Sequence, residues 1–326
     1  PRLIEKYYSQ MKEWFKYVDK YTVDGLLKRW PDTKYRDWYL GDWLAPMGVD
    51  AGNQASVDLV SNCFISECLS TMYKTAITLG KREEAEEFAI RREKLNKLIH
   101  QTFYRADEGI YSTGSQLDMC YPMLVGVVPD SLYNKVKENV VAMTEEKYKG
   151  HIAVGLVGVP ILTEWAVRNK QVDFFYQMMK KRDYPGYLYM IDHGATATWE
   201  YWSGERSRVH NCYNGIGTWF YQAVGGIRLD EAKPGYRHFY VDPQIPNGVT
   251  WVKVTKESPY GTIAVNWKLK DDNQLNLQLT VPAGTTATVC IPNNAVSCKK
   301  NKKKVSVKEQ TVDVEAGHYD FLFNLK

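Results

Sequence analysis

The chain has 326 residues, of which 44% are hydrophobic and 25% charged, and its formal net charge is +4. This composition is typical of a folded protein with room for about two domains. The small net charge gives no reason to expect nucleic acid or an anionic membrane surface as a partner, and no apolar run approaches the roughly 18 residues that span a bilayer.

Aromatic residues are unusually abundant, with 10 Trp and 23 Tyr. Buried rings usually serve packing, but many of these lie beside Gly, Asp and Glu in expected loops, where flat rings next to acids suit sugar faces. The six cysteines show no CxxC pair and no zinc-ligand spacing, so we expect ordinary thiols, no metal and no cofactor. The sequence is compatible with a Cys290–Cys298 disulfide but does not require one.

The first two-thirds of the chain has helical periodicity. Apolar side chains recur at helical spacing over residues 2–21, 57–79 and 82–104, and Gly80 ends the second stretch. Shorter helical patterns follow, which makes roughly eight expected helices in all: 116–126, 131–146, 155–169, 171–182 and 210–226.

The pattern changes after Pro234. Apolar and polar residues alternate over residues 263–269, 275–281 and 319–325, with shorter alternating pieces around Val305 and Val312. Such strands with turns between them indicate an antiparallel β-sandwich. We therefore expect a helical domain over residues 1–233 and a sandwich over residues 234–326.

The segment from Tyr184 to Gly226 is the most informative for function. It contains Trp199-Glu200-Tyr201-Trp202 between two expected helices. A carboxylate between two indoles has both parts of a glycosidase subsite, because the rings stack on a pyranose and the acid handles a proton or a water. The alternative is a Glu that caps the next helix, with both indoles in the core. Composition alone favours neither.

A second cluster, residues 38–44, again places two indoles and an acid in a linker between expected helices. Asp42 follows Gly41, which permits a tight turn, and precedes Trp43. This repetition of the tryptophan-plus-acid theme favours sugar binding, although a turn or cap role for Asp42 is equally compatible with the pattern.

Several motifs resemble those of the bacterial α-L-rhamnosidases of glycoside hydrolase family 78. Residues 194–202, GATATWEYW, resemble the family pattern around its catalytic base, and residues 184–190, YPGYLYM, resemble its aromatic turn. His210 with Gly217 and Trp219, GDWLAP at 41–46, PGYRHF at 234–239 and SPYG at 258–261 match further family stretches in the same order.

The resemblance implies the later helices of an (α/α)6 toroid followed by a β-sandwich. It implies Glu200 as the general base of an inverting hydrolase that releases α-L-rhamnose from glycans or glycosides. The family's general acid lies upstream of its Gly-Asp-Trp stretch, so we expect the remainder of a longer polypeptide before Pro1 to supply it. The implied sugar-binding residues are Asp42, Trp43, Tyr187, Trp199, Trp202 and His210.

Two other classes of function remain. One is a different (α/α)6 carbohydrate enzyme, either a phosphorylase or another glycosidase, and the other is a non-catalytic sugar-binding module.

In an inverting hydrolase the two carboxyl groups are usually about 6.5–9.5 Å apart, with room for a water. The sequence leaves the cellular compartment open between periplasm, exterior and cytoplasm.

Overall fold

The computed structural model describes residues 1–30, 38–46, 54–271 and 273–326. The chain forms two compact units. The first comprises residues 1–165 and 177–214, and the second comprises residues 166–176 and 215–326. Each unit is described by itself.

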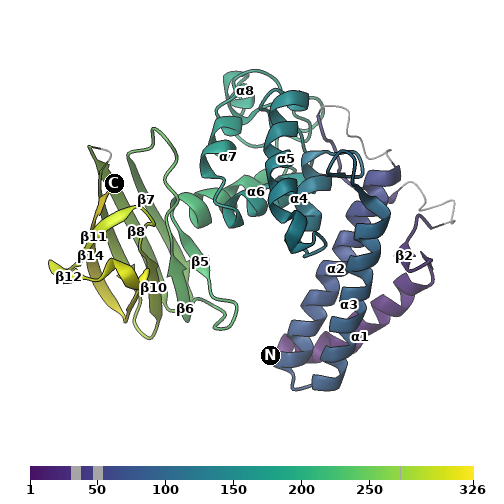
Figure 1. Ribbon diagram of the computed structural model, residues 1–326, viewed down its shortest axis with the longest axis horizontal. Helices are drawn as coiled ribbons and strands as arrows, with labels where there is room; N and C mark the ends of the chain where they lie inside the picture. Colours follow the sequence, from purple (N-terminus) through teal and green to yellow (C-terminus); the bar gives the residue numbers. More distant parts are fainter. Residues whose placement is uncertain (31–37, 47–53, 272) are drawn as a thin grey trace. The chain divides into compact units, whose positions relative to one another are not determined.

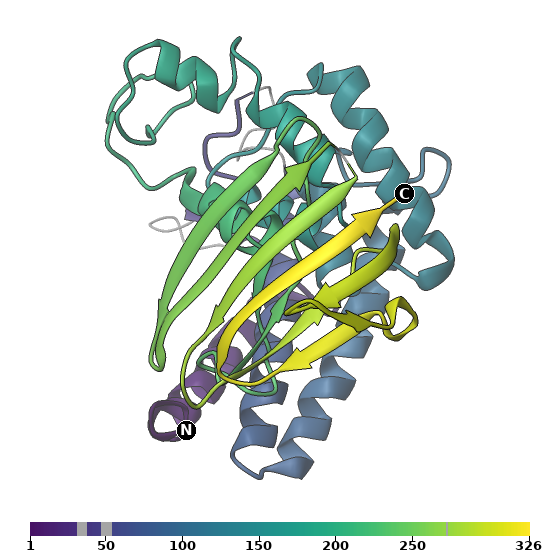
Figure 2. The same cartoon turned by 90° about the vertical axis from the view of Figure 1, so that its left-hand side faces the viewer.

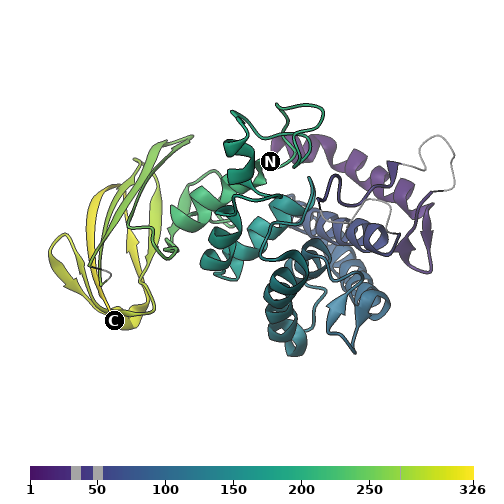
Figure 3. The same ribbon diagram turned by 90° about the horizontal axis from the view of Figure 1, so that it is seen from above.

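Three long helices open the first unit: α1 (Arg2–Asp19), α2 (Gln54–Thr78) and α3 (Arg82–Phe103). Figures 1 and 3 show them with the small hairpin β1 (Thr22–Val23) and β2 (Leu26–Leu27) that follows α1. α1 buries Phe15 against Phe88 of α3, with ring centroids 6.1 Å apart. The described residues cover the face of α1 that carries Tyr8, Phe15 and Val18, whereas Leu3, Tyr7 and Trp14 are exposed.

α2 is buried on several faces, and its polar residues are paired accordingly. Asn62 accepts the Leu27 N–H at 2.8 Å and donates to the Leu27 carbonyl at 3.0 Å. Ser66 donates to Asn96 of α3 at 2.6 Å. Asn62 and Ser66 are fully buried, and buried polar side chains must find partners within the protein, which explains why these two form non-local pairs.

Shorter elements complete the first unit. The hairpin of β3 (Tyr104–Arg105) and β4 (Ile110–Tyr111) leads to α4 (Gln116–Leu124) and α5 (Asp130–Tyr148). α6 (Gly158–Arg168) and α7 (Val172–Met179) each cross from one unit to the other. α8 (Tyr187–Asp192) is a short helix inside the segment expected to be a loop.

The second unit contains two sheets. The smaller has the order β13-β10-β6-β5, and the larger has the order β12-β11-β14-β9-β8-β7 and faces the viewer in Figure 2. The strand bounds are β5 Ile227–Leu229, β6 His238–Val241, β7 Trp251–Ser258, β8 Gly261–Lys270, β9 Gln274–Val281, β10 Thr286–Cys290, β11 Ala295–Lys300, β12 Lys303–Val305, β13 Thr311–Val314 and β14 Gly317–Leu325.

The larger sheet is antiparallel throughout, whereas β6 and β10 of the smaller sheet run parallel. Trp267, Leu277 and Phe321 lie inside the sandwich and are at most 2% exposed. Cys290 and Cys298 are free thiols, so the disulfide left open by the sequence is not formed.

The predicted architecture, helices followed by a β-sandwich, is confirmed. One expected helix differs: residues 210–226 form a 3₁₀ turn, η2 (Asn214–Ile216), and a π-helix, η3 (Trp219–Val224). The predicted domain boundary at 233/234 lies between β5 and β6, which are paired in one sheet.

Candidate active site

The segment around Glu200 is a loop closed by its own backbone. The Glu200 N–H donates to the Ser207 carbonyl at 2.9 Å, and the His210 N–H donates to the Thr198 carbonyl at 2.8 Å. The Thr198 hydroxyl lies 2.5 Å from the His210 carbonyl and closes the same end. These bonds fix the backbone at Glu200 and at His210. A side chain on a loop can act at a defined position only when its backbone is held in this way.

The Glu200 side chain is half-buried and keeps most of its capacity to accept hydrogen bonds. Its Oε2 accepts one bond, from the Ser207 N–H at 3.3 Å. Within the described part of the chain, no group donates to Oε1. A carboxylate offers about four lone-pair sites, so Glu200 can still accept a proton from a bound water or hydroxyl.

Tyr213 connects the Glu200 loop to the Gly41–Pro46 segment. Its buried hydroxyl lies 3.1 Å from the Glu200 carbonyl and 3.2 Å from the Leu44 carbonyl. Its ring stacks on Trp202, with centroids 4.1 Å apart. Burial raises the pKa of Tyr213, so the hydroxyl keeps its proton and remains a donor to these carbonyls.

Both indoles that flank Glu200 lie in the interior. Trp202 is 1% exposed, and its Nε1 donates to the Val154 carbonyl at 2.9 Å. Trp199 is also 1% exposed, and the Arg208 guanidinium lies over its ring at 5.2 Å. Neither ring presents a face for a sugar, which differs from the predicted role of both as subsite walls.

Asp42 is likewise buried, at 2% exposure. Its Oδ2 accepts the Gly155 N–H at 2.7 Å, and its Oδ1 accepts the Gly158 N–H at 2.9 Å. Burial raises the pKa of Asp42 to about 6, against the lowering effect of these two bonds. The side chain holds a turn together, and its burial leaves it out of reach of a sugar in this chain, which differs from the sugar-binding role implied by the resemblance.

The two glycines of that turn are required by its packing. A Cβ at residue 155 would lie 2.0 Å from the Trp43 carbonyl oxygen, and one at residue 158 would lie 2.8 Å from Asp42 Oδ2. The Trp43 carbonyl also accepts the Leu156 N–H at 2.7 Å. Trp43 itself is half-buried, so part of its ring remains available.

His210 is half-buried beside the loop closure. Its Nδ1 lies 3.2 Å from the Cys212 N–H, which can only donate. The neutral imidazole therefore carries its proton on Nε2, where it can donate to a ligand hydroxyl. Burial, followed by the negative charge of Glu200, raises the pKa of the Cys212 thiol to about 11, so this thiol stays protonated at neutral pH.

Tyr187 is half-buried and anchored to the same group of residues. Its hydroxyl donates to the Tyr213 carbonyl at 2.8 Å, and its ring meets Trp202 edge-on at 5.2 Å. Tyr187, Trp202 and Glu200 thus all contact Tyr213, which the sequence did not single out. No local pattern marks Tyr213, because its partners at Leu44 and Glu200 are 169 and 13 residues away.

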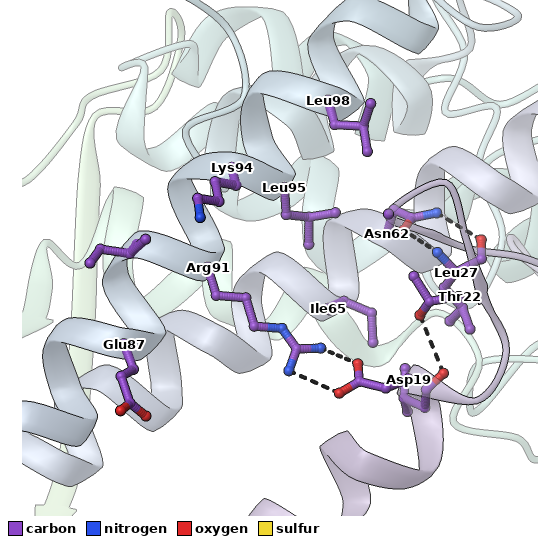
Figure 4. Close-up of a pocket in the computed structure, with 13 residues that line it drawn as sticks. Asp19, Thr22, Leu27, Asn62, Ile65, Glu87, Arg91, Lys94, Leu95 and Leu98 are labelled. Carbon is purple, nitrogen blue, oxygen red and sulfur yellow. Dashed lines mark hydrogen bonds and ion pairs between the residues drawn. The ribbon is translucent and has the colours of Figure 1, made fainter.

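A cavity of about 520 Å³ lies elsewhere in the first unit, and none of the predicted site residues lines it. Its walls come from the end of α1, from α2 and from α3, and include Ile65, Leu95 and Leu98 (Figure 4). The ion pair between Arg91 and Asp19 crosses one side of it.

The described residues contain no cluster of three or more His, Cys, Asp or Glu side chains that could hold a metal ion. None of the described helices is both long and apolar enough to span a membrane.

Comparison with known families identifies both parts of the chain. Residues 1–224 match the bacterial α-L-rhamnosidase six-hairpin glycosidase domain, and residues 226–306 match the bacterial α-L-rhamnosidase C-terminal domain. The chain belongs to the bacterial α-L-rhamnosidase family. The two matched domains meet at residues 224–226, at the end of η3.

Individual family members resemble the chain along nearly its whole length. α-L-Rhamnosidases of Alteromonas sp. (strain LOR) and Formosa agariphila are 25% and 26% identical over 98% of this chain. The chain spans 35% and 36% of the lengths of these two relatives.

Two solved structures share the fold. An α-L-rhamnosidase from Dictyoglumus thermophilum superposes with a TM-score of 0.86 at 20% identity, covering 98% of this chain and 37% of that one. The Streptomyces avermitilis α-L-rhamnosidase complexed with L-rhamnose gives 0.85 at 22% identity, covering 98% and 31%.

Proposed function

We propose that the polypeptide containing this chain is an inverting α-L-rhamnosidase in which Glu200 is the general base. The proposal rests on the Glu200 carboxylate, which is held in a defined position and has one oxygen free to accept a proton. Its backbone is fixed at the N–H and at the carbonyl, yet its Oε1 is unpaired among the described residues. Membership of a glycosidase family supplies the reaction class.

The chemistry assigned to Glu200 is removal of a proton from the attacking water. In an inverting hydrolase this water attacks the anomeric carbon from the face opposite the leaving group, while a second carboxyl group protonates the leaving oxygen. We place that general acid outside these 326 residues. The relatives named above are almost three times as long as this chain, which is compatible with an acid supplied by another part of the polypeptide.

The substrate is a glycan or glycoside that carries terminal α-L-rhamnose, and three of the predicted residues suit direct contact with it. Trp43 and Tyr187 are half-buried rings that suit the apolar C6 methyl of the sugar, and His210 offers a donor at Nε2. Asp42, Trp199 and Trp202 are assigned supporting positions, because all three are at most 2% exposed.

Substitution of Glu200 in the complete natural polypeptide tests the proposal. Glu200→Gln keeps the shape of the side chain and removes the base, so kcat for p-nitrophenyl α-L-rhamnopyranoside is expected to fall about a thousandfold. Glu205→Gln is the matched control, since Glu205 lies exposed in the same loop, and it should retain wild-type activity.

The same assay separates the alternatives. Activity that requires inorganic phosphate would indicate a phosphorylase, and unchanged hydrolysis by Glu200→Gln would refute the base assignment. A wild-type protein that binds rhamnosides without turnover would be a binding module.

A further inference from the structure

A continuous row of side chains crosses the outward face of the six-stranded sheet. The strand register aligns one residue of each strand, because every neighbouring pair in the row is a pair of opposed residues. From one edge of the sheet to the other, the row is Trp251, Lys268, Asn276, Leu322, Lys299 and Lys304. At about 4.8 Å per strand, it extends roughly 24 Å.

The exposure of these residues shows which face they occupy. Trp251 is 65% exposed, and Lys268, Asn276, Lys299 and Lys304 are all exposed. Their neighbours one position along the strands point inward, since successive side chains alternate between faces. Figure 2 shows this sheet face-on.

Amide side chains occupy the rows on either side. Asn266 and Gln278 lie opposite each other in one adjacent row, and Gln274 and Asn324 do so in the other. Gln274 donates to Asn324 at 3.1 Å, which holds these two amides in a defined orientation. Amides offer both donors and acceptors, so they can pair with the hydroxyl groups of a sugar.

The face is also hollowed and basic. A cavity of about 790 Å³ is lined by Asn276, Lys299, Asn301, Lys302 and His318, among others. The outward lysines on the six strands are Lys253, Lys268, Lys270, Lys299 and Lys304, whereas the outward acids on the same strands are Glu257 and Asp320. Beside the strands, Lys302 and Asp271 are both exposed. The Asp320 carboxylate already accepts from Gln278 at 3.2 Å.

We propose that this outward sheet face binds a carboxylate-bearing polysaccharide. The lysines would pair with the sugar carboxylates, the amides with hydroxyls, and the exposed Trp251 ring with a pyranose face. The choice of a glycan as the polyanion rests on the proposed glycosidase function. The surface would hold an acidic polymer while its rhamnose ends reach the hydrolytic site.

Binding to a defined polymer tests the surface without any turnover. Dissociation constants are measured at low salt with polygalacturonate as the acidic probe, dextran as the neutral probe and double-stranded DNA as an alternative polyanion. The complete polypeptide is used in each assay. Wild-type protein should bind polygalacturonate, and should bind dextran and DNA much more weakly.

Two variants remove separate parts of the surface. Lys268→Gln/Lys299→Gln should weaken polygalacturonate binding by about tenfold or more, since each lost pair involves a charged hydrogen bond. Trp251→Ala should weaken it by about fivefold, through the lost ring contact. Lys6→Gln/Lys135→Gln removes the same charge from exposed positions on helices α1 and α5, and should bind as wild type does.

Equal binding by all variants, or no binding of polygalacturonate, overturns the proposal. DNA binding that matches polygalacturonate and is indifferent to Trp251→Ala also overturns it, because the face would then be an unspecific basic surface. Glu200→Gln should bind polygalacturonate as wild type does, so a failure of the hydrolase assignment and a failure of the sheet assignment give different results.

Discussion

Asp42 and Glu200 occupy similar sequence contexts but have opposite surroundings in the structure. Each acid lies next to a tryptophan in a segment rich in glycine and aromatic residues. Both oxygens of Asp42 accept backbone N–H groups, and the side chain is 2% exposed. Glu200 is half-buried and accepts one long bond, at 3.3 Å.

The difference lies in the backbone donors that surround each acid. The turn at Gly155–Gly158 approaches Asp42 because glycine lets the chain come close, whereas the loop around Glu200 uses its backbone groups to close on itself. A buried acid whose two oxygens each accept a backbone N–H is a structural element, and an acid with an unpaired oxygen is available for chemistry. Flanking tryptophans do not distinguish these cases.

The largest effect on stability is expected at Asp42. Asp42→Asn turns an amide NH₂ toward a buried N–H donor, so we expect the free energy of unfolding to fall by about 3 kcal/mol at neutral pH. Glu200→Gln should change it by less than about 0.5 kcal/mol, as is usual away from buried networks. Urea unfolding of both variants measures the contrast, and equal losses would erase the distinction between the two acids.

The penalty of Asp42→Asn should also depend on pH. The folded-state pKa of about 6 lies above the ordinary 3.8, so the folded state takes up a proton as pH falls through 6 while the unfolded state does so near 4. Wild type therefore gains stability relative to Asp42→Asn in this window, by up to about 3 kcal/mol. A stability difference that stays constant from pH 7 to pH 4 would contradict this.

A smaller effect is expected from the loop that carries Glu200. Gly204 has φ +81°, and a Cβ there would lie 2.7 Å from the Trp199 ring. Gly204→Ala should cost about 2 kcal/mol from backbone strain plus this clash. Gly194 has φ +85° with no atom within 4 Å of such a Cβ, so Gly194→Ala isolates the strain and should cost about 1 kcal/mol. Equal losses of stability in Gly204→Ala and Gly194→Ala, measured by urea unfolding, would mean that the close approach of Trp199 to Gly204 does not constrain the loop.

A loss of about 1 kcal/mol in the free energy of unfolding, similar to that of Gly194→Ala, is expected for Tyr213→Phe, which removes the hydroxyl shared by the Leu44 and Glu200 carbonyls. Misplacement of the base should lower kcat of the complete polypeptide about tenfold and leave KM within about twofold. Tyr39→Phe is the control, because Tyr39 also donates a buried hydroxyl to a carbonyl, that of Leu27 at 3.1 Å. A similar loss of kcat in both variants would reduce Tyr213 to a packing residue.

Much of the fold follows from periodicity, and the exceptions have physical causes. Long apolar stripes locate α2 and α3 within a few residues of their observed bounds. The strands β5 and β6 escape detection because they are three and four residues long and lack strict alternation. The apolar spacing over 210–226 does not distinguish a π-helix from an α-helix, and nothing local encodes the parallel pairing of β6 with β10.

The candidate site is less predictable than the fold. Motif resemblance locates Glu200, but the burial of Trp199 and Trp202 depends on packing that no local pattern encodes. The partners of Asp42 are 113 and 116 residues away in the chain, so its structural role emerges only when the Gly155–Gly158 turn is placed beside it.

The stereochemistry of the first product tests the central claim most directly. Proton NMR of the complete polypeptide acting on p-nitrophenyl α-L-rhamnopyranoside identifies the anomer that is released before mutarotation. A base that activates water on the face opposite the leaving group gives β-L-rhamnose first. Release of α-L-rhamnose first would show that a covalent intermediate forms, and would contradict the role assigned to Glu200.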